Sequence, residues 1–155
     1  MIRYNIENSS IGGNMEYTMT DDPRQEDIDI VLDKLKKFNL SHIELAEVKP
    51  LAIFVKDEKD VIIGGISAET HGNWLKVFYL CLDENIREQK IGTKLLQDAE
   101  TEAIARGCRY SFLDTFGFQA RDFYVKAGYR EVFTLEDYPV FGKRHYMVKQ
   151  LAEDV

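Results

Sequence analysis

Residues 87–94 bring together three basic side chains, a glycine and the expected start of a helix. Arg87, Lys90 and Lys94 supply the positive charge, and Gly92 lies at the turn. A helix start presents backbone N–H groups without intrahelical partners and the positive end of the helix dipole, and both suit a phosphate. The segment therefore predicts a phosphate or pyrophosphate site. The competing interpretation is a tight turn at Gly92 followed by a solvated, basic helical turn.

A second segment that could do chemistry, residues 120–129, has the sequence ARDFYVKAGY. It predicts a short amphipathic helix with Phe123 and Ala127 facing the core and with Gly128 at its end. Tyr124 on this helix could donate a proton, because a phenol has an ordinary pKa of about 10. Taken alone, Tyr124 is more typical of a packed tyrosine than of a catalytic one.

Helix-type and strand-type patterns alternate along the chain and supply the elements that must position both segments. Asp22 followed by Pro23 predicts a helix start with Asp22 as the N-cap. Runs of β-branched and aromatic residues between polar turns predict a three-stranded meander before the phosphate-binding segment. We expect helices over residues 23–39, 91–106 and 119–127, a short helix from Ser41 that ends before Pro50, and strands over residues 51–56, 61–69, 75–82, 110–115, 129–135 and 144–150.

Composition and charge narrow the class of protein. A chain of 155 residues with 45% hydrophobic residues has the size of one domain, so we expect a single domain over residues 1–155, with residues 1–16 as an N-terminal strand or arm. The net charge of −7 disfavours nucleic acid and favours a cationic partner such as an amine. No stretch approaches the roughly twenty apolar residues of a membrane helix, and Cys81 and Cys108 make no disulfide framework. We therefore expect a cytoplasmic protein with neither a nucleic-acid nor a membrane partner.

The two segments, in this order and at this separation, resemble the cofactor motifs of the GNAT acetyltransferase superfamily. Residues 82–96 resemble its phosphate-binding motif, Arg/Gln-x-x-Gly-x-Gly/Ala before a leucine-rich helix, and residues 120–129 resemble its second cofactor motif. Lys90 stands where the first motif usually has its first glycine, and Gly117 stands where the second often has an asparagine. We expect the loop to keep a negative φ at Lys90 and Glu88 to point away from the phosphate.

The resemblance implies a single-domain α/β fold with a mixed central sheet of about six or seven strands, a splayed parallel pair and about four flanking helices. Acetyl-CoA would lie between the strand that ends at Leu82 and the strand that ends near Asp114. The backbone at the end of the first strand would pair with the pantetheine arm as an extra strand does. No metal ligand is expected, and the implied cofactor-binding residues are Leu80, Cys81, Leu82, Arg87, Glu88, Gln89, Lys90, Ile91, Gly92, Thr93, Lys94, Ala120, Tyr124 and Lys126.

The activity that the resemblance implies is N-acetyltransfer, in which the primary amine of a small molecule or peptide attacks the thioester directly. Tyr124 is then the expected general acid, and a backbone N–H at residues 81–82 is the expected oxyanion donor. The general base stays open among Asp114, Glu69 and His145. Asp114 is preferred because it ends the strand beside the cleft, whereas the alternating pattern around His145 favours a structural histidine.

The acceptor and two rival functions complete the expectations. Aromatic and acidic residues in the loop 136–142 suit a cationic amine, and they equally suit an ordinary packed loop. A homodimer is compatible with the sequence. The first rival function is an acyl-CoA-binding or regulatory module without turnover, and the second is a protein-interaction domain that binds no cofactor.

Overall fold

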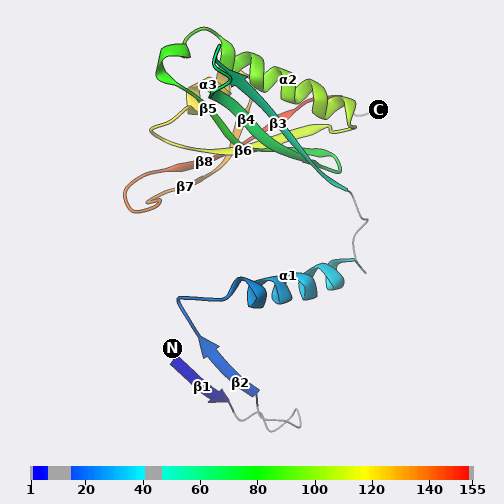
Figure 1. Cartoon of the computed structure of the whole chain (residues 1–155), viewed down its shortest axis with the longest axis vertical. Helices are drawn as coiled ribbons and strands as arrows, with labels where there is room; N and C mark the ends of the chain where they lie inside the picture. The colour runs from blue at the N-terminus through cyan, green and yellow to red at the C-terminus, as the bar shows by residue number, and fades with distance from the viewer. Residues whose placement is uncertain (1, 7–14, 41–46, 154–155) are drawn as a thin grey trace. The chain divides into compact units, whose positions relative to one another are not determined.

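The computed structural model describes residues 2–6, 15–40 and 47–153 of the chain. The chain divides after Leu45 into two compact units, which are described separately below (Figure 1). The short helix predicted from Ser41 falls on residues 41–46, outside the described ones. None of the helices in the described part of the chain is long and apolar enough to cross a membrane.

The first unit contains a β-hairpin and one helix. Strand β1 (Ile2–Ile6) pairs antiparallel with β2 (Met15–Met19), and helix α1 (Gln25–Asn39) follows. The predicted N-cap at Asp22 is wrong, because the carbonyl of Arg24 accepts the first helical hydrogen bonds. Arg24 also pairs its guanidinium with the Asp27 carboxylate at 2.8 Å, and the helix starts two residues later than the sequence pattern indicates.

The second unit is built on a six-stranded mixed sheet in the order β3-β4-β5-β6-β8-β7. All neighbouring strands are antiparallel except β5 and β6, which confirms the expected mixed sheet with one parallel pair. The strands are β3 (Val48–Lys56), β4 (Ile62–His71), β5 (Trp74–Leu82), β6 (Tyr110–Phe116), β7 (Arg130–Leu135) and β8 (Arg144–Gln150). Strand β3 starts three residues earlier than predicted, since its place at the sheet edge tolerates Pro50.

Helices α2 (Ile91–Ala105) and α3 (Arg121–Lys126) complete the second unit, with a 3-10 turn, η1 (Glu84–Ile86), before α2. With α1 they make three α-helices in the described part of the chain, one fewer than expected. Figure 1 shows α2 running along the sheet beside β3 and β4. Apolar residues recur on one face of α2, where Leu95, Ala99 and Ala103 are buried in the core and Ile91 is partly buried. Gly107, at a φ of 91°, takes the left-handed conformation that ends the helix.

The parallel pair β5–β6 opens toward its carboxyl end. Its ladder runs only from the pair Trp74 and Tyr110 to the pair Lys76 and Phe112, and among the described residues it goes no further. A β-bulge interrupts the pairing of β5 with β4 at Phe78, since Tyr79 pairs with Ser67 and Val77 with the next residue. Such a bulge bends the strand that carries it. The remainder of β5 therefore diverges from β6, and the expected splay is confirmed.

Candidate active site

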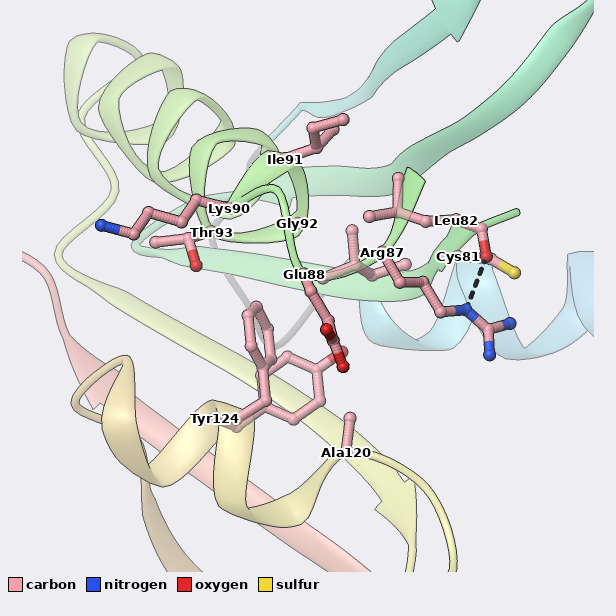
Figure 2. A pocket seen from close by; sticks show the side chains of 12 residues that line it. Cys81, Leu82, Arg87, Glu88, Lys90, Ile91, Gly92, Thr93, Ala120 and Tyr124 are labelled. Carbon is pink, nitrogen blue, oxygen red and sulfur yellow. Dashed lines mark hydrogen bonds between the residues drawn. The ribbon is translucent and has the colours of Figure 1, made fainter. Parts of the chain in front are cut away.

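A cavity of about 420 Å³ lies beside the diverging end of β5. This volume falls in the range of small-molecule sites. Figure 2 shows that its wall is made by the end of β5, the loop and first turn of α2, and α3. The lining residues are Leu80, Cys81, Leu82, Arg87, Glu88, Lys90, Ile91, Gly92, Thr93, Ala120, Phe123 and Tyr124. Sequence and structure thus place the two predicted segments at one site.

Four predicted residues do not line this cavity, and one that does was not predicted as a site residue. Gln89, Lys94, Lys126 and Asp114 lie outside the lining. Phe123 was assigned to the core on helical spacing, and it does pack against the core while its ring also faces the cavity near Gly92. Its position directly before Tyr124 on a short helix beside the phosphate-binding turn was the signal that could have identified it.

The loop before α2 takes a conformation that the sequence analysis did not expect. Glu88 has a φ of 66° and Lys90 a φ of 61°, so the prediction of a negative φ at Lys90 is wrong. A left-handed conformation costs a residue with a side chain roughly 1–2 kcal/mol, which explains why a glycine is the usual choice at such a position. The chain accepts this strain because the loop must turn sharply from η1 into α2.

The first turn of α2 presents its backbone N–H groups without a side-chain cap. Lys90 occupies the N-cap position and makes no side-chain capping hydrogen bond. The first turn also carries no acidic side chain. Ile91, Gly92 and Thr93 all line the cavity, so these uncapped donors and the positive dipole end lie at its wall. This is the arrangement that a phosphate requires.

The basic side chains contribute less to the cavity than their number in the sequence indicates. Arg87 donates from Nε to the carbonyl oxygen of Leu82 at 3.1 Å, the contact drawn in Figure 2, and so ties the loop to the end of β5. Lys94 pairs with Asp98 at 2.8 Å on the outer side of α2. The Lys90 side chain extends away from Tyr124 in Figure 2. An anion in this cavity would therefore be bound mainly by backbone N–H groups.

Glu88 places a carboxylate inside the cavity, contrary to the expectation that it points outward. Figure 2 shows its side chain extending from the loop in the direction of Tyr124. The left-handed φ is the physical reason, because a positive φ gives the Cα–Cβ bond a different direction from the one it has in a loop at negative φ. A negative charge thus occupies a cavity whose backbone donors favour an anion.

Tyr124 is held inside the wall of the cavity by aromatic contacts. Only 7% of the residue is exposed, and its ring meets those of Phe123 and Tyr129 edge to face, with centroid distances of 5.1 and 5.8 Å. Burial, and secondarily the Asp114 carboxylate, raises the pKa of Tyr124 to about 12. The phenol therefore stays protonated at neutral pH and can act as a donor.

The three candidate bases differ in their surroundings. Asp114 accepts a hydrogen bond from Arg144 Nε at 2.6 Å, and this contact raises the pKa of Arg144. His145 Nδ1 lies 2.9 Å from Thr134 Oγ1 and 3.2 Å from a Glu131 oxygen, which favours the structural interpretation. Glu69 pairs in register with Lys76, so it lies toward the closed end of the sheet, which is the end where β5 and β6 are still paired. Only Asp114 lies at the carboxyl end of β6.

The sheet and cavity define an α/β protein that can hold a phosphate-bearing cofactor beside two splayed parallel strands. Residues 16–129 match the Acetyltransferase (GNAT) family, so the chain belongs to the GNAT acetyltransferases. It is 32% identical to a blasticidin-S acetyltransferase of Streptomyces morookaense over 72% of this chain and 85% of that protein. A crystal structure of an acetyltransferase from Bacillus cereus ATCC 14579 matches with 29% identity and a TM-score of 0.78 over 86% of this chain and 97% of that one.

A more distant match shows the fold alone. An aminoglycoside 6'-N-acetyltransferase complexed with coenzyme A has a TM-score of 0.60 and 17% identity, covering 100% of this chain and 99% of that one. GNAT acetyltransferases use acetyl-CoA. The described residues fit this cofactor, because the uncapped start of α2 offers phosphate donors and the end of β5 has an edge without a ladder partner. Ala120 and Phe123 add an apolar wall opposite that edge.

Proposed function

We propose that this protein transfers the acetyl group of acetyl-CoA to a primary amine of a small molecule or peptide by direct attack on the thioester. The observation that carries the proposal is the single cavity that joins the uncapped start of α2 to Tyr124 along the end of β5. A cofactor whose phosphates lie at Gly92 would extend along this wall toward the phenol. Binding, orientation and proton donation are thereby available at one site.

The residues around the cavity have distinct proposed roles. Acetyl-CoA supplies the acetyl group in activated form, as a thioester. The edge of β5 at residues 80–82 pairs with an extended, amide-bearing chain, and a backbone N–H there stabilises an oxyanion. Tyr124 donates its phenolic proton to the departing thiolate. The Arg87 contact with the Leu82 carbonyl fixes the phosphate-binding loop relative to that edge.

Asp114 is the proposed general base. The geometry of the sheet supports the division of roles in which Asp114 is the base and Tyr124 is the acid. In β6 the residues Ser111, Leu113 and Thr115 are buried on the side of the helices, so Asp114 alternates onto the opposite side. Tyr124 belongs to the helix side. Direct attack needs a base for the amine and an acid for the thiolate, and the two groups flank the open end of the sheet. Among the described residues, Arg144 contacts Oδ2 of Asp114. The Oδ1 atom of Asp114 can then accept the proton of the amine through a water molecule.

The proposed acceptor is a cationic amine. The net charge of −7 attracts such a substrate, and one relative is named for its action on blasticidin S. The aromatic rings near Asp114 bear on the same question. Arg144 already lies over the rings of Phe116 and Tyr138, at 5.5 and 5.2 Å from their centroids. We therefore assign recognition of the acceptor's charge to carboxylates rather than to these rings.

The direct test is an acceptor screen that follows thiol release, with polyamines, aminoglycosides, amino acids and peptide N-termini as candidates. With an accepted substrate, Tyr124→Phe is expected to lower kcat by about 100-fold while the KM for acetyl-CoA stays nearly constant. Tyr110→Phe, which removes a phenol at the closed end of β6, is the matched control. If the protein binds coenzyme A tightly and acetylates nothing in the screen, the non-catalytic acyl-CoA module replaces this proposal.

The remaining organisation is proposed on similar grounds. The family match begins at residue 16, in the first unit, and supports one acetyltransferase domain across the whole chain. Both cysteines are free thiols, Cys108 buried and Cys81 exposed, which supports the cytoplasm as the compartment. A homodimer remains part of the proposal, and light scattering of the purified protein would test it.

A further inference from the structure

A buried polar cluster lies behind the active site and has no role in the steps above. It consists of Glu100 from α2, Ser111 from β6, Tyr129 before β7, and Lys149 from β8. Lys149 Nζ donates to Glu100 Oε2 at 2.6 Å, and the hydroxyl groups of Ser111 and Tyr129 lie 2.7 Å apart. Ser111 is fully buried, and Tyr129 and Glu100 are only 3% and 6% exposed. Three elements and the residue before β7 thus meet at one polar site.

Tyr129 joins the two parts of this cluster. Its hydroxyl group bonds with Ser111, and Lys149 Nζ lies 5.6 Å from the centroid of its ring. Burial, and then the nearby Glu100 carboxylate, raises the pKa of Tyr129 far above its ordinary value. The phenol is therefore neutral at all physiological pH values. None of the four residues lines the cavity, so the cluster does not touch a substrate there.

The other end of Tyr129 is attached directly to Tyr124. Its backbone N–H donates to the Tyr124 carbonyl at 2.9 Å, and the two rings meet edge to face at an interplanar angle of 70°. Gly128, at a φ of 92°, makes the sharp turn that brings the second ring back against the first. A movement of the Tyr129 ring would therefore change both the packing and the backbone of Tyr124.

Helix α3 needs an anchor of this kind. It has six residues, and its N-cap, Ala120, supplies no capping side chain. A helix so short has little stability of its own and takes its position from tertiary contacts. A buried ion pair adds little to stability compared with an apolar residue of the same shape, whereas it can fix a unique arrangement. The cluster is thus better suited to placing α3 than to stabilising the core.

We propose that Tyr129, held at its hydroxyl group by Ser111 and at its ring by Lys149 of the Glu100–Lys149 ion pair, is a positioning residue that sets the orientation of the Tyr124 phenol in the active site. This inference rests on the proposed function of Tyr124. In this proposal the buried cluster affects the reaction only through Tyr129, whose ring contacts the Tyr124 ring and whose backbone N–H donates to the Tyr124 carbonyl. The hydroxyl group of Tyr129 is the part of the cluster that a single substitution can remove with the smallest change in shape.

The test combines kinetics with a probe of Tyr124 itself. Tyr129→Phe is expected to lower kcat about tenfold with an unchanged KM for acetyl-CoA, and to cause no further loss of kcat in a Tyr124→Phe background. A fluorotyrosine at position 124 should show a shifted or broadened fluorine NMR signal in the Tyr129→Phe protein. Should Tyr129→Phe fold poorly, Ser111→Ala makes the same test with a smaller change.

The control is Thr70→Val, which removes another buried hydroxyl group, one bonded to the Lys49 carbonyl at 3.4 Å toward the closed end of the sheet. It should lower stability without changing kcat or the signal of residue 124. An equal loss of kcat in both backgrounds, or an unchanged signal in Tyr129→Phe, overturns the positioning role. If the wild-type protein acetylates nothing while the fluorine signal of residue 124 still changes in Tyr129→Phe, the result contradicts the proposed function and not the contact between the two tyrosines. The two failures are therefore distinguishable.

Discussion

At the scale of single residues, the shifted ionisation of Tyr124 gives a testable link between burial and stability. Its pKa is about 12 in the folded protein and about 10 in an unfolded chain. Because folding favours the neutral phenol, its contribution to stability is complete below pH 10 and is lost as the pH rises from about 10 to about 12. The loss corresponds to about 2–3 kcal/mol. Urea unfolding over this pH interval should show it.

The comparison for this prediction is Tyr124→Phe, which cannot ionise. As the pH rises through the same interval, the unfolding free energy of the wild type should fall relative to that of this variant. Lysine and other groups that titrate there affect both proteins alike, so the difference isolates Tyr124. Parallel curves for the two proteins would show that the phenol is not buried as described.

Glu88 gives a second prediction at this scale, since its carboxylate lies in the cavity that must accept phosphates. Glu88→Gln keeps the shape of the side chain and removes its charge. We expect the affinity for acetyl-CoA to rise by about three- to tenfold, measured by isothermal titration calorimetry. Glu58→Gln, at an exposed turn residue, is the matched control. An affinity that stays constant or falls would mean that the Glu88 carboxylate moves out of the cavity when acetyl-CoA binds and does not repel its phosphates.

Most of the cavity lining could be predicted because residues 82–96 and 120–129 resemble two family motifs, and the resemblance implies which of these residues face the cofactor. What could not be predicted were side-chain directions and long-range partners. The inward course of Glu88 follows from one backbone angle, and motif spacing does not reveal φ. The contact between Asp114 and Arg144 joins positions on separate strands, and the sequence offers no sign of such a pair.

At the scale of elements, the start of α2 links helix stability to cofactor binding. A Cβ at Gly92 would lie 3.6 Å from Leu82 Cδ1 and 3.8 Å from Phe123 Cζ, both ordinary contacts. Gly92→Ala should therefore stabilise the ligand-free protein by about 0.5–1 kcal/mol, because alanine is the better helix former. The same methyl group faces the cavity wall and should weaken acetyl-CoA binding several-fold.

Thermal unfolding with and without acetyl-CoA measures both effects in one experiment. The variant should unfold at a higher temperature than the wild type when no cofactor is added, and the order should reverse or the gap should close at saturating acetyl-CoA. If the gap is the same in both conditions, the turn at Gly92 does not approach the cofactor. Leu96→Met, a conservative change on the buried side of α2, gives a reference for substitutions in this helix.

Most elements of the second unit were predictable, since strongly periodic runs specify them locally. Helix α2 and strands β4 to β6 match their expected ranges closely because their apolar positions alternate or recur with a clear period. The start of β3 was missed, because the restriction that Pro50 places on a helix does not apply at a sheet edge. The bulge at Phe78 depends on register with β4, which a single strand pattern does not contain.

At the scale of the whole molecule, the net charge of −7 predicts how the enzyme responds to salt. Attraction of a cationic acceptor acts over the Debye length, which falls from about 30 Å at 0.01 M to about 10 Å at 0.1 M ionic strength. We expect kcat/KM for a diamine acceptor to fall over this interval. An acceptor of equal size with one amine replaced by a hydroxyl group should fall less. Equal salt dependence of the two acceptors would remove the argument for a cationic substrate.

The open inner edge of β5 has a consequence for local motion in the sheet. Beyond Lys76 this edge has no ladder partner on β6 among the described residues, although it lies in the middle of the sheet and not at its margin. Amide hydrogens that point toward the gap should therefore exchange with solvent quickly in the free protein, and slowly once a bound amide chain has filled the position of the missing neighbour. Hydrogen-exchange rates at the centre of this sheet would then report the fraction of protein with bound coenzyme, because the coenzyme takes the position of a neighbouring strand.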